Sequence, residues 1–174
     1  MNKKVLIVMG SDSDLPIMQE AAKALEKMGV PSEIRISSAH RVPDKTAQLA
    51  REAEQNGFAV IIAGAGLAAH LPGVIAAHTT LPVIGVPIQG GAIQGVDALY
   101  AIVQMPQGIP VATVAINGAY NAGLLAAQII ATSDAEVAAK LKAHREEMAK
   151  KVEEKDAKLQ DLGASAYIKE VLKR

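Results

Sequence analysis

The sequence contains no cysteine, which excludes disulfide bonds and thiol nucleophiles from all 174 residues. Aromatic residues are also scarce, at 2%, with no tryptophan and a single phenylalanine, although 50% of the residues are hydrophobic. The core must therefore be built from alanine, valine, isoleucine and leucine. Such a composition suits a closely packed α/β layer structure.

An excess charge of either sign is also missing, because 18 Lys and Arg residues balance 18 Asp and Glu residues. No overall field then favours nucleic acid or an acidic membrane surface, and an anionic ligand must be held by a local site. We expect no nucleic-acid partner.

Long uninterrupted apolar runs are absent as well. The run at 5–10 is too short for the core of a signal peptide. The segment 58–77 approaches the length of a membrane span, but glycine, histidine and proline residues interrupt it. We therefore expect a cytoplasmic protein without a membrane partner.

Short apolar runs alternate with amphipathic segments through the first 133 residues. The run at 5–9 is apolar at every position, which is typical of a strand buried on both faces of a parallel sheet. Segment 14–28 has apolar side chains at helical spacing and ends at Gly29, which indicates a helix. The same patterns predict strands at 32–36, 58–63, 82–86 and 111–116, and helices at 43–56, 95–104 and 121–132. This alternation predicts an α/β fold with a doubly wound parallel sheet.

Beyond residue 133 the sequence is rich in Lys and Glu and keeps only an apolar stripe at helical spacing. The stripe comprises Val137, Leu141, Met148, Val152 and Leu159. We divide the chain into a catalytic domain, 1–133, and a C-terminal helical extension, 134–174. One helix cannot bury such a stripe alone, so we expect the extension to pack on the body or on a neighbouring subunit. The alanine-rich segment 122–131, apolar all round, also favours an oligomer.

Ligands of open α/β sheets bind beyond the carboxyl ends of the strands, so the loops there are candidate sites. The first loop, 10–14, offers Ser11, Ser13 and Asp14 together with the free N–H groups of a helix start. Such an arrangement binds phosphate and other anions. Serine and aspartate are also ordinary helix caps, so this loop taken alone favours a structural role over a functional one.

The second loop, 37–44, contains Ser38, His40 and Arg41. Arg41 offers a planar fork of donors for a phosphate, and Ser38 offers a further donor. His40 can give and accept a proton near neutral pH. Alternatively, His40 caps the next helix and Arg41 pairs with a surface carboxylate, but a sharply turned polar loop at a strand end favours a functional role.

The third loop, 63–73, is built from small residues and contains one titratable group, His70. Gly64, Ala65 and Gly66 allow the backbone to approach a planar ligand. The glycine pattern lacks the rest of the dinucleotide fingerprint. For a lone histidine, burial with a hydrogen bond to a carbonyl is the preferred interpretation.

The fourth loop, 87–95, is rich in glycine and either closes over a ligand or forms a flexible connection. No histidine and carboxylate cluster has metal-binding spacing, and cysteine is absent. We therefore expect no metal site and no cofactor.

Several motifs occur together in one order and spacing: MGSDSD at 9–14, SAHR at 38–41 and GAGLAAHLPG at 64–73. GVDAL at 95–99, IVQMP at 102–106 and NAGLLAA at 121–127 follow. On these motifs, residues 4–160 resemble the class I N5-carboxyaminoimidazole ribonucleotide mutases, the catalytic subunits of phosphoribosylaminoimidazole carboxylase. The class rests on HLPG at 70–73 and on Arg41 after His40, where the class that uses free carbon dioxide typically has lysine.

The resemblance implies an isomerase that converts N5-carboxyaminoimidazole ribonucleotide to 4-carboxy-5-aminoimidazole ribonucleotide in de novo purine (IMP) biosynthesis. It implies a flavodoxin-like three-layer sandwich with a central parallel sheet and a long C-terminal helical extension. It further implies a homo-oligomer, an octamer, with sites at subunit contacts.

The resemblance also implies roles for individual residues. His40 matches the general acid and base, and His70 matches the histidine near the migrating carboxyl group. The residues implied to bind substrate are Ser11, Ser13, Asp14, Ser38, Arg41, Gly64, Ala65, Gly66 and Leu71.

The chain departs from the family pattern at Leu67, where glycine or methionine is usual, and at Gly90 and Gly91, which replace serine or threonine. Ala98 and Ala101 replace serine. We expect Leu67 to narrow the pocket and the two glycines to loosen the loop that covers it, without a change of reaction type. Two alternatives stay open, a carbon dioxide-dependent aminoimidazole ribonucleotide carboxylase and a non-catalytic nucleotide-binding module of flavodoxin-like fold.

Overall fold

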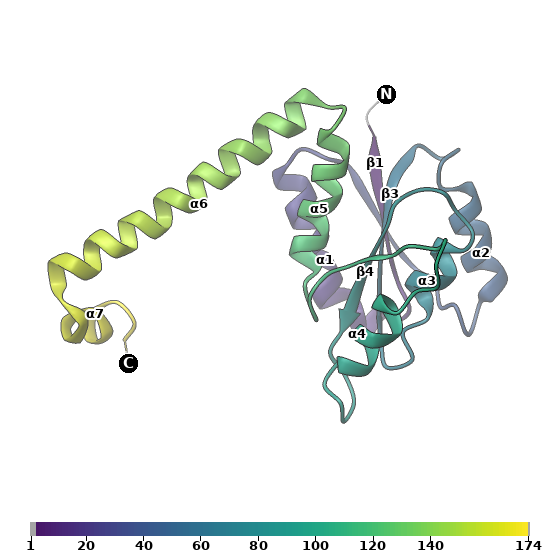
Figure 1. Ribbon diagram of the computed structural model, residues 1–174, viewed down its shortest axis with the longest axis horizontal. Helices are drawn as coiled ribbons and strands as arrows, with labels where there is room; N and C mark the ends of the chain where they lie inside the picture. Colours follow the sequence, from purple (N-terminus) through teal and green to yellow (C-terminus); the bar gives the residue numbers. More distant parts are fainter. Residues whose placement is uncertain (1–2, 174) are drawn as a thin grey trace.

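Five parallel strands form the central sheet of the computed structural model, which describes residues 3–173 (Figure 1). In chain order they are β1 (Lys4–Met9), β2 (Ser32–Ile36), β3 (Phe58–Gly66), β4 (Val83–Ile88) and β5 (Ala112–Thr113). Across the sheet their order is β2-β1-β3-β4-β5, and every neighbouring pair is parallel. This is the flavodoxin-like order, so the predicted fold is confirmed.

Helices cover both faces of the sheet and make it the middle of three layers. α1 (Leu15–Lys27), which follows the short turn η1 (Asp12–Asp14), packs with α5 (Ala119–Ala131) on one face. The other face is covered by α2 (Pro43–Glu52), α3 (Leu71–Ala76) and α4 (Val96–Val103).

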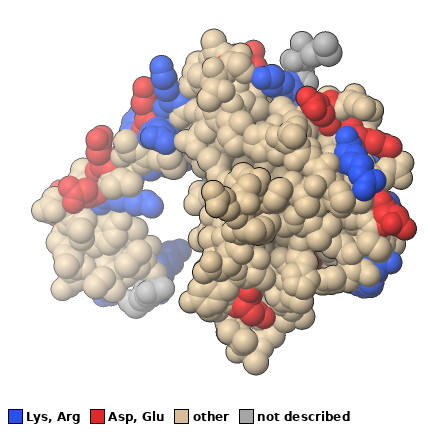
Figure 2. Space-filling model, turned by 45° about the vertical axis from the view of Figure 1, so that its right-hand side comes forward, with Lys and Arg blue, Asp and Glu red and all other residues tan. Residues whose placement is uncertain are grey.

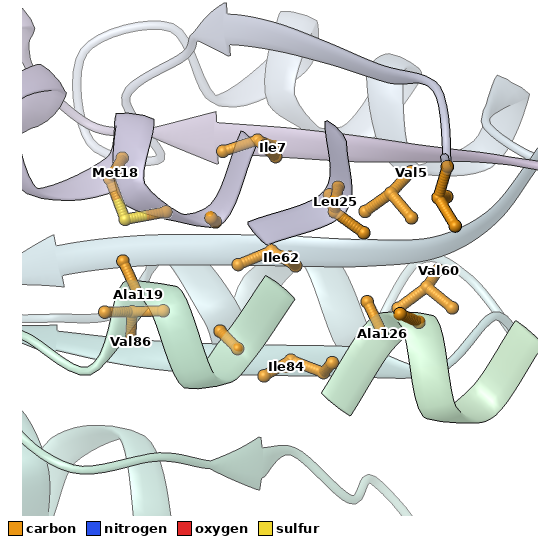
Figure 3. Packing of buried hydrophobic residues seen from close by; sticks show 14 of the residues in the cluster. Val5, Ile7, Met18, Leu25, Val60, Ile62, Ile84, Val86, Ala119 and Ala126 are labelled. Carbon is orange, nitrogen blue, oxygen red and sulfur yellow. The ribbon is translucent and has the colours of Figure 1, made fainter. Parts of the chain in front are cut away.

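The alternation of side chains along β1 divides the core into two parts. Val5 and Ile7 face α1 and α5 (Figure 3), whereas Leu6 and Val8 face the helices of the opposite layer. All four side chains are fully buried. A strand buried on both faces has no polar position, which explains the unbroken apolar run in the sequence.

Several element boundaries differ from the predicted ones because strand pairing decides them. β3 continues beyond residue 63 because Ala65 and Gly66 pair with Pro87 and Ile88 of β4. β5 is shorter than the predicted strand at 111–116, since its two residues alone pair with β4. Because β3 and β4 end side by side, at Gly66 and Ile88, the loops that follow them start at the same edge of the sheet.

The prediction of 63–73 as a loop was wrong at its end, because α3 begins at Leu71. Pro72 and Gly73 interrupt the apolar pattern, and six residues are too few to show helical periodicity. Proline in the first turn of a helix loses no hydrogen bond, since the N–H it lacks has no partner there. Burial of Leu71 and Ile75 against the sheet then holds the short helix.

The C-terminal segment forms α6 (Ala135–Leu162) and α7 (Ala164–Glu170). The Asp134 side chain caps α6 by accepting from two backbone N–H groups of its first turn. The first part of α6 packs on α5, and Lys27 of α1 holds it through an ion pair of 2.9 Å with Glu147. Lys151 and Lys27 together lower the pKa of Glu147 to about 2.

Beyond Glu147 the rest of α6 and α7 extend away from the body as an arm, which we define as residues 148–173 (Figure 1). Gly163, at φ 73°, ends α6 and allows the chain to turn into α7. The predicted boundary between 133 and 134 falls just before α6. Of the two predicted domains, 1–133 and 134–174, the terminal residues Met1, Asn2 and Arg174 lie outside the described residues. No helix within 3–173 is long and apolar enough to span a membrane.

Candidate active site

A cavity of about 570 Å³ lies at the carboxyl ends of β1 to β4, where their four following loops meet. Nine of the eleven predicted site residues line it: Ser11, Ser13, Asp14, Ser38, His40, Arg41, Ala65, Gly66 and Leu71. Sequence reasoning did not place Gly10, Ile17, Ala39, Ala68 and Ile88 there, although all five lie in or next to the same loops. Small and apolar loop residues carry no chemical signal that would have identified them.

Two of the predicted site residues, Gly64 and His70, do not line this cavity within the described part of the chain. Gly64 lies inside β3, where an added Cβ would clash with the sulfur of Met18. The absence of a side chain at Gly64 therefore lets α1 pack closely on β3. His70 is connected to the cavity through its hydrogen bond with His40.

His40 and His70 are brought together from the loops after β2 and β3. His40 Nε2 lies 2.8 Å from His70 Nδ1, with the ring planes at 89° and their centroids 5.0 Å apart. One nitrogen of this pair must donate and the other must accept, because two protonated or two bare nitrogens cannot form the bond. The pair therefore holds one proton between the rings and fixes the orientation of His40.

The loop after β1 arranges hydroxyl groups at the start of α1. The Ser13 hydroxyl donates to Ser11 Oγ at 3.0 Å, and Ser11 donates to the Asp12 carboxylate at 3.1 Å. Partial burial raises the pKa of the Asp14 carboxyl above its ordinary value, although hydrogen bonding with Ser11 and Ser13 opposes that shift. An acidic group with a raised pKa in a cavity is a common feature of functional sites.

Two buried hydroxyl groups hold the loop that carries His40 and Arg41. The Ser37 hydroxyl lies 2.8 Å from Thr46 Oγ1 of α2, and Thr46 donates in turn to the carbonyl of Val42. Ser37 and Thr46 are 1% and 0% exposed, so neither hydroxyl has water as an alternative partner. The residues between Ser37 and Val42 are thus fixed at both ends. The sequence did not indicate this role for Thr46. Its partner Ser37 lies 9 residues away, outside the helix, and a threonine hydroxyl bonded to the carbonyl 4 residues earlier is common in helices.

The loop after β4 is tied to the segment after β5 and is not a free connection. The Asn117 side chain accepts from the Gln89 backbone N–H at 2.9 Å and donates to the Gln89 side chain at 3.1 Å. Gln89 also donates to Gln94, whose side chain reaches the Gly91 carbonyl. The expectation that two glycines loosen this loop is not supported by these bonds.

The cavity has a polar side and an apolar side. The loops after β1 and β2 contribute its hydroxyl groups, its carboxylate and its guanidinium group. The loops after β3 and β4 contribute mostly small or apolar residues. His40 lines the cavity from the loop after β2, and His70 contacts it through the hydrogen bond between the rings. Within residues 3–173 no three histidine or acidic side chains are grouped so as to hold a metal ion. The arrangement suits an anionic ligand bound at the polar side, with His40 next to it for proton transfer.

Comparison with known proteins identifies the family of the chain. The family AIR carboxylase matches residues 4–151. The protein of Pyrococcus horikoshii named N5-carboxyaminoimidazole ribonucleotide mutase is 56% identical to this chain, over 94% of this chain and 93% of the relative. The protein of the same name from Thermotoga maritima is 53% identical, over 95% of this chain and 96% of the relative. The phosphoribosylaminoimidazole carboxylase of Schizosaccharomyces pombe is 53% identical over 92% of this chain and 29% of its own length.

Solved structures agree in fold. The crystal structure of Treponema denticola PurE superposes with a TM-score of 0.83 at 33% identity, over 90% of this chain and 98% of that one. The family match covers the sheet, all four loops of the cavity and the first part of α6. The chain therefore belongs to the AIR carboxylase family.

Proposed function

We propose that this chain is an isomerase that converts N5-carboxyaminoimidazole ribonucleotide to 4-carboxy-5-aminoimidazole ribonucleotide in de novo purine biosynthesis. This proposal is carried by the hydrogen-bonded pair of His40 and His70, because His40 lines a cavity that has a polar side and an apolar side. The names of the Pyrococcus horikoshii and Thermotoga maritima relatives support the same reaction.

The substrate is oriented by the two sides of the cavity. Arg41, Ser38 and the loop of Ser11, Ser13 and Asp14 bind the phosphate and ribose, because they supply the charged and hydroxyl groups. The imidazole ring then lies toward Ala65, Gly66 and Leu71, where the backbone can approach a flat ligand. The carboxyl group to be moved comes next to the histidine pair.

His40 moves the proton in both halves of the reaction. The N–C bond of the carbamate breaks, carbon dioxide leaves, and the ring amine takes a proton from His40. C4 of the aminoimidazole then attacks carbon dioxide, and the proton on C4 returns to His40. Atoms and charge balance, and the reaction involves no net oxidation or reduction. His70, which does not line the cavity, holds His40 in place through the hydrogen bond.

An assay with two substrates tests the proposal. We expect faster turnover of N5-carboxyaminoimidazole ribonucleotide than of aminoimidazole ribonucleotide with bicarbonate. The family name, AIR carboxylase, would also describe the second candidate, a carboxylase that uses free carbon dioxide. Faster turnover of the second substrate pair would establish that candidate. Binding of the nucleotide without turnover of either would indicate a non-catalytic module.

The protein is further proposed to act in the cytoplasm as an octamer with sites at subunit contacts. In support, the arm carries apolar side chains that remain exposed in the single chain, with Met148 at 44%, Val152 at 66% and Ile168 at 47%. α4 likewise exposes Val96 and Tyr100. Figure 2 shows mostly uncharged side chains over the middle of the body, whereas basic and acidic side chains both occur along the arm. Such surfaces are typical of subunit contacts.

Light scattering tests the assembly. We expect a mass of eight times the 18.1 kDa of one chain. Val152→Glu, on the apolar stripe of the arm, lowers that mass, whereas Glu153→Gln on the charged face of the same helix leaves it unchanged. A wild-type mass of one chain at working concentrations would contradict the octamer.

A further inference from the structure

Leu67, directly after β3, has a backbone conformation that a leucine rarely adopts. Its φ is 53°, in the left-handed region, and its side chain is 57% exposed at the edge of the cavity. Branched apolar side chains disfavour this region, and burial within the chain does not compensate for it here. A residue held in an unfavourable conformation at a cavity is a candidate for a functional role.

The Leu67 side chain crosses from the loop after β3 to the loop after β4. Leu67 Cδ2 lies 2.7 Å from the position that a Cβ on Gly91 would take, closer than real Cβ contacts allow. The corresponding distance at Gly90 is 4.0 Å, an ordinary contact. The space above Gly91 is therefore filled by Leu67. The two departures from the family pattern, a large residue at 67 and a glycine at 91, are complementary.

The surface that Leu67 meets is fixed. Gly91 accepts from the Gln94 side chain, and Gln89 in the same loop is held by two hydrogen bonds to Asn117. Leu67 thus contacts a tied backbone segment and not a mobile loop. The contact joins the two loops that form the apolar side of the cavity.

We propose that the contact between Leu67 and Gly91 closes the apolar side of the cavity and keeps released carbon dioxide next to the substrate. This inference rests on the proposed function. Carbon dioxide is uncharged and donates no hydrogen bond, so polar side chains hold it only weakly. An apolar wall that blocks the exit to solvent is then the effective way to retain it. Leu67 is a positioning residue in this scheme, since it touches neither the ring nor the proton that moves.

The consequence is a competition between recarboxylation and escape. When carbon dioxide stays, C4 captures it and the product keeps the original carboxyl group. When it leaves, the enzyme releases aminoimidazole ribonucleotide, and any carboxylated product formed later draws its carboxyl group from dissolved bicarbonate. The fraction of aminoimidazole ribonucleotide released and the label taken from ¹⁴C-bicarbonate therefore measure closure separately from turnover.

The test compares Leu67→Asn with Leu67→Met. Asparagine accepts the left-handed backbone more readily than leucine but replaces the apolar side chain with a polar one, whereas methionine keeps an apolar chain of similar volume. We expect Leu67→Asn to raise both the released fraction and the incorporated label about tenfold, equivalent to about 1.4 kcal/mol of lost closure. Leu67→Met keeps both near the wild-type values. Spontaneous decarboxylation is subtracted with a reaction without enzyme.

A double-mutant cycle tests the contact itself. Gly91→Ser displaces Leu67, so it raises the released fraction in the wild-type background and adds little when residue 67 is asparagine. Backbone strain at Gly91, whose φ is 61°, is the same in both backgrounds and cancels. Gly90→Ser is the matched control in the same loop, and its effect does not depend on residue 67.

The outcomes separate the inference from the function on which it rests. If the wild-type enzyme does not convert N5-carboxyaminoimidazole ribonucleotide, the proposed function fails. If it does and Leu67→Asn and Leu67→Met release equal fractions, the closure proposal is overturned while the function stands. Circular dichroism melts of each variant ensure that only folded enzyme is compared.

Discussion

His40 Nε2 and His70 Nδ1 lie 2.8 Å apart, although 30 residues separate them in the chain. His40 follows β2 and His70 precedes α3, and the two rings meet because β2 and β3 both flank β1 and end at the same edge of the sheet. A hydrogen bond between two imidazoles orients both rings and leaves the other nitrogen of His40, Nδ1, outside that bond. This relationship leads to the first prediction.

His40→Asn is expected to lower kcat by a factor of about 10²–10⁴, the usual contribution of a general acid and base. Nucleotide binding is retained, because Arg41 and the serine loops are untouched. His70→Asn lowers kcat by a smaller factor, since it removes the partner that orients His40 and not the group that moves the proton. In a double variant the two losses are less than multiplicative if the histidines act as a unit. Equal and multiplicative losses would show that they act independently.

Arg41→Lys is expected to raise KM about tenfold and to leave kcat nearly unchanged. Lysine keeps the positive charge but loses the planar fork that can bind a phosphate through two hydrogen bonds. Initial rates over a range of substrate concentrations separate the two parameters. Lys45→Arg, on exposed α2 nearby, is the control for a change of cation type. A fall in kcat with constant KM for Arg41→Lys would place Arg41 at the reacting atoms instead.

Asp14→Asn is expected to stabilise the fold at neutral pH while it weakens nucleotide binding. Partial burial raises the folded-state pKa of Asp14, so the folded state holds the proton more tightly than the unfolded state. Stability from this group is therefore present at low pH and is lost as pH rises through the interval between the unfolded and folded pKa values. Melting curves of wild type and variant should differ near pH 7 and converge at about pH 3.5, below the ordinary aspartate pKa. A lower melting temperature for the variant at pH 7 contradicts this sign.

Thr46→Val is expected to destabilise the fold by about 1–3 kcal/mol, because it leaves the buried Ser37 hydroxyl without its partner. It should also raise KM, since Thr46 holds the loop of Ser38, His40 and Arg41. Chemical denaturation gives the first value and steady-state kinetics the second. Thr113→Val, which removes a part-buried hydroxyl from β5, controls for the loss of a threonine elsewhere. An unchanged KM for Thr46→Val would limit Thr46 to a role in folding.

His144→Leu is expected to raise the melting temperature. The His144 residue of α6 is 8% exposed, and neither ring nitrogen has a hydrogen-bond partner among residues 3–173. A buried polar group without a partner costs about 1–3 kcal/mol relative to one that is paired, and an apolar residue of similar size avoids that cost. Thermal unfolding of the assembled protein checks the sign. A lower melting temperature would show that a neighbouring subunit supplies a partner to this ring.

The sequence was most informative where burial leaves a local pattern. The unbroken apolar run of β1 and the helical spacing of α1 predicted both elements, because each records which side chains avoid water. The loops of Ser11, His40 and His70 were found for a related reason. Polar or small residues at the end of a buried strand have no role in the core, and parallel strands end at one edge of the sheet.

Three features depended on the tertiary structure. α3 is stabilised by contacts of Leu71 and Ile75 with the sheet, and six residues containing proline and glycine carry no local helical signal. The support of the His40 loop comes from Thr46, whose hydroxyl is indistinguishable in sequence from any other in a helix. The complementarity of Leu67 and Gly91 joins positions 24 residues apart, and neither residue by itself predicts the contact.

The sequence by itself determined the alternation of elements, the layer architecture and the four loops of the cavity, because these follow from hydrophobic periodicity and the direction of parallel strands. Only the tertiary structure decided which side chains meet: His40 with His70, Ser37 with Thr46, and Leu67 with Gly91. The physical reason is distance along the chain. Periodicity records the environment of each residue relative to its near neighbours, whereas a hydrogen bond or a close contact between loops depends on where strand pairing places segments that are far apart in sequence.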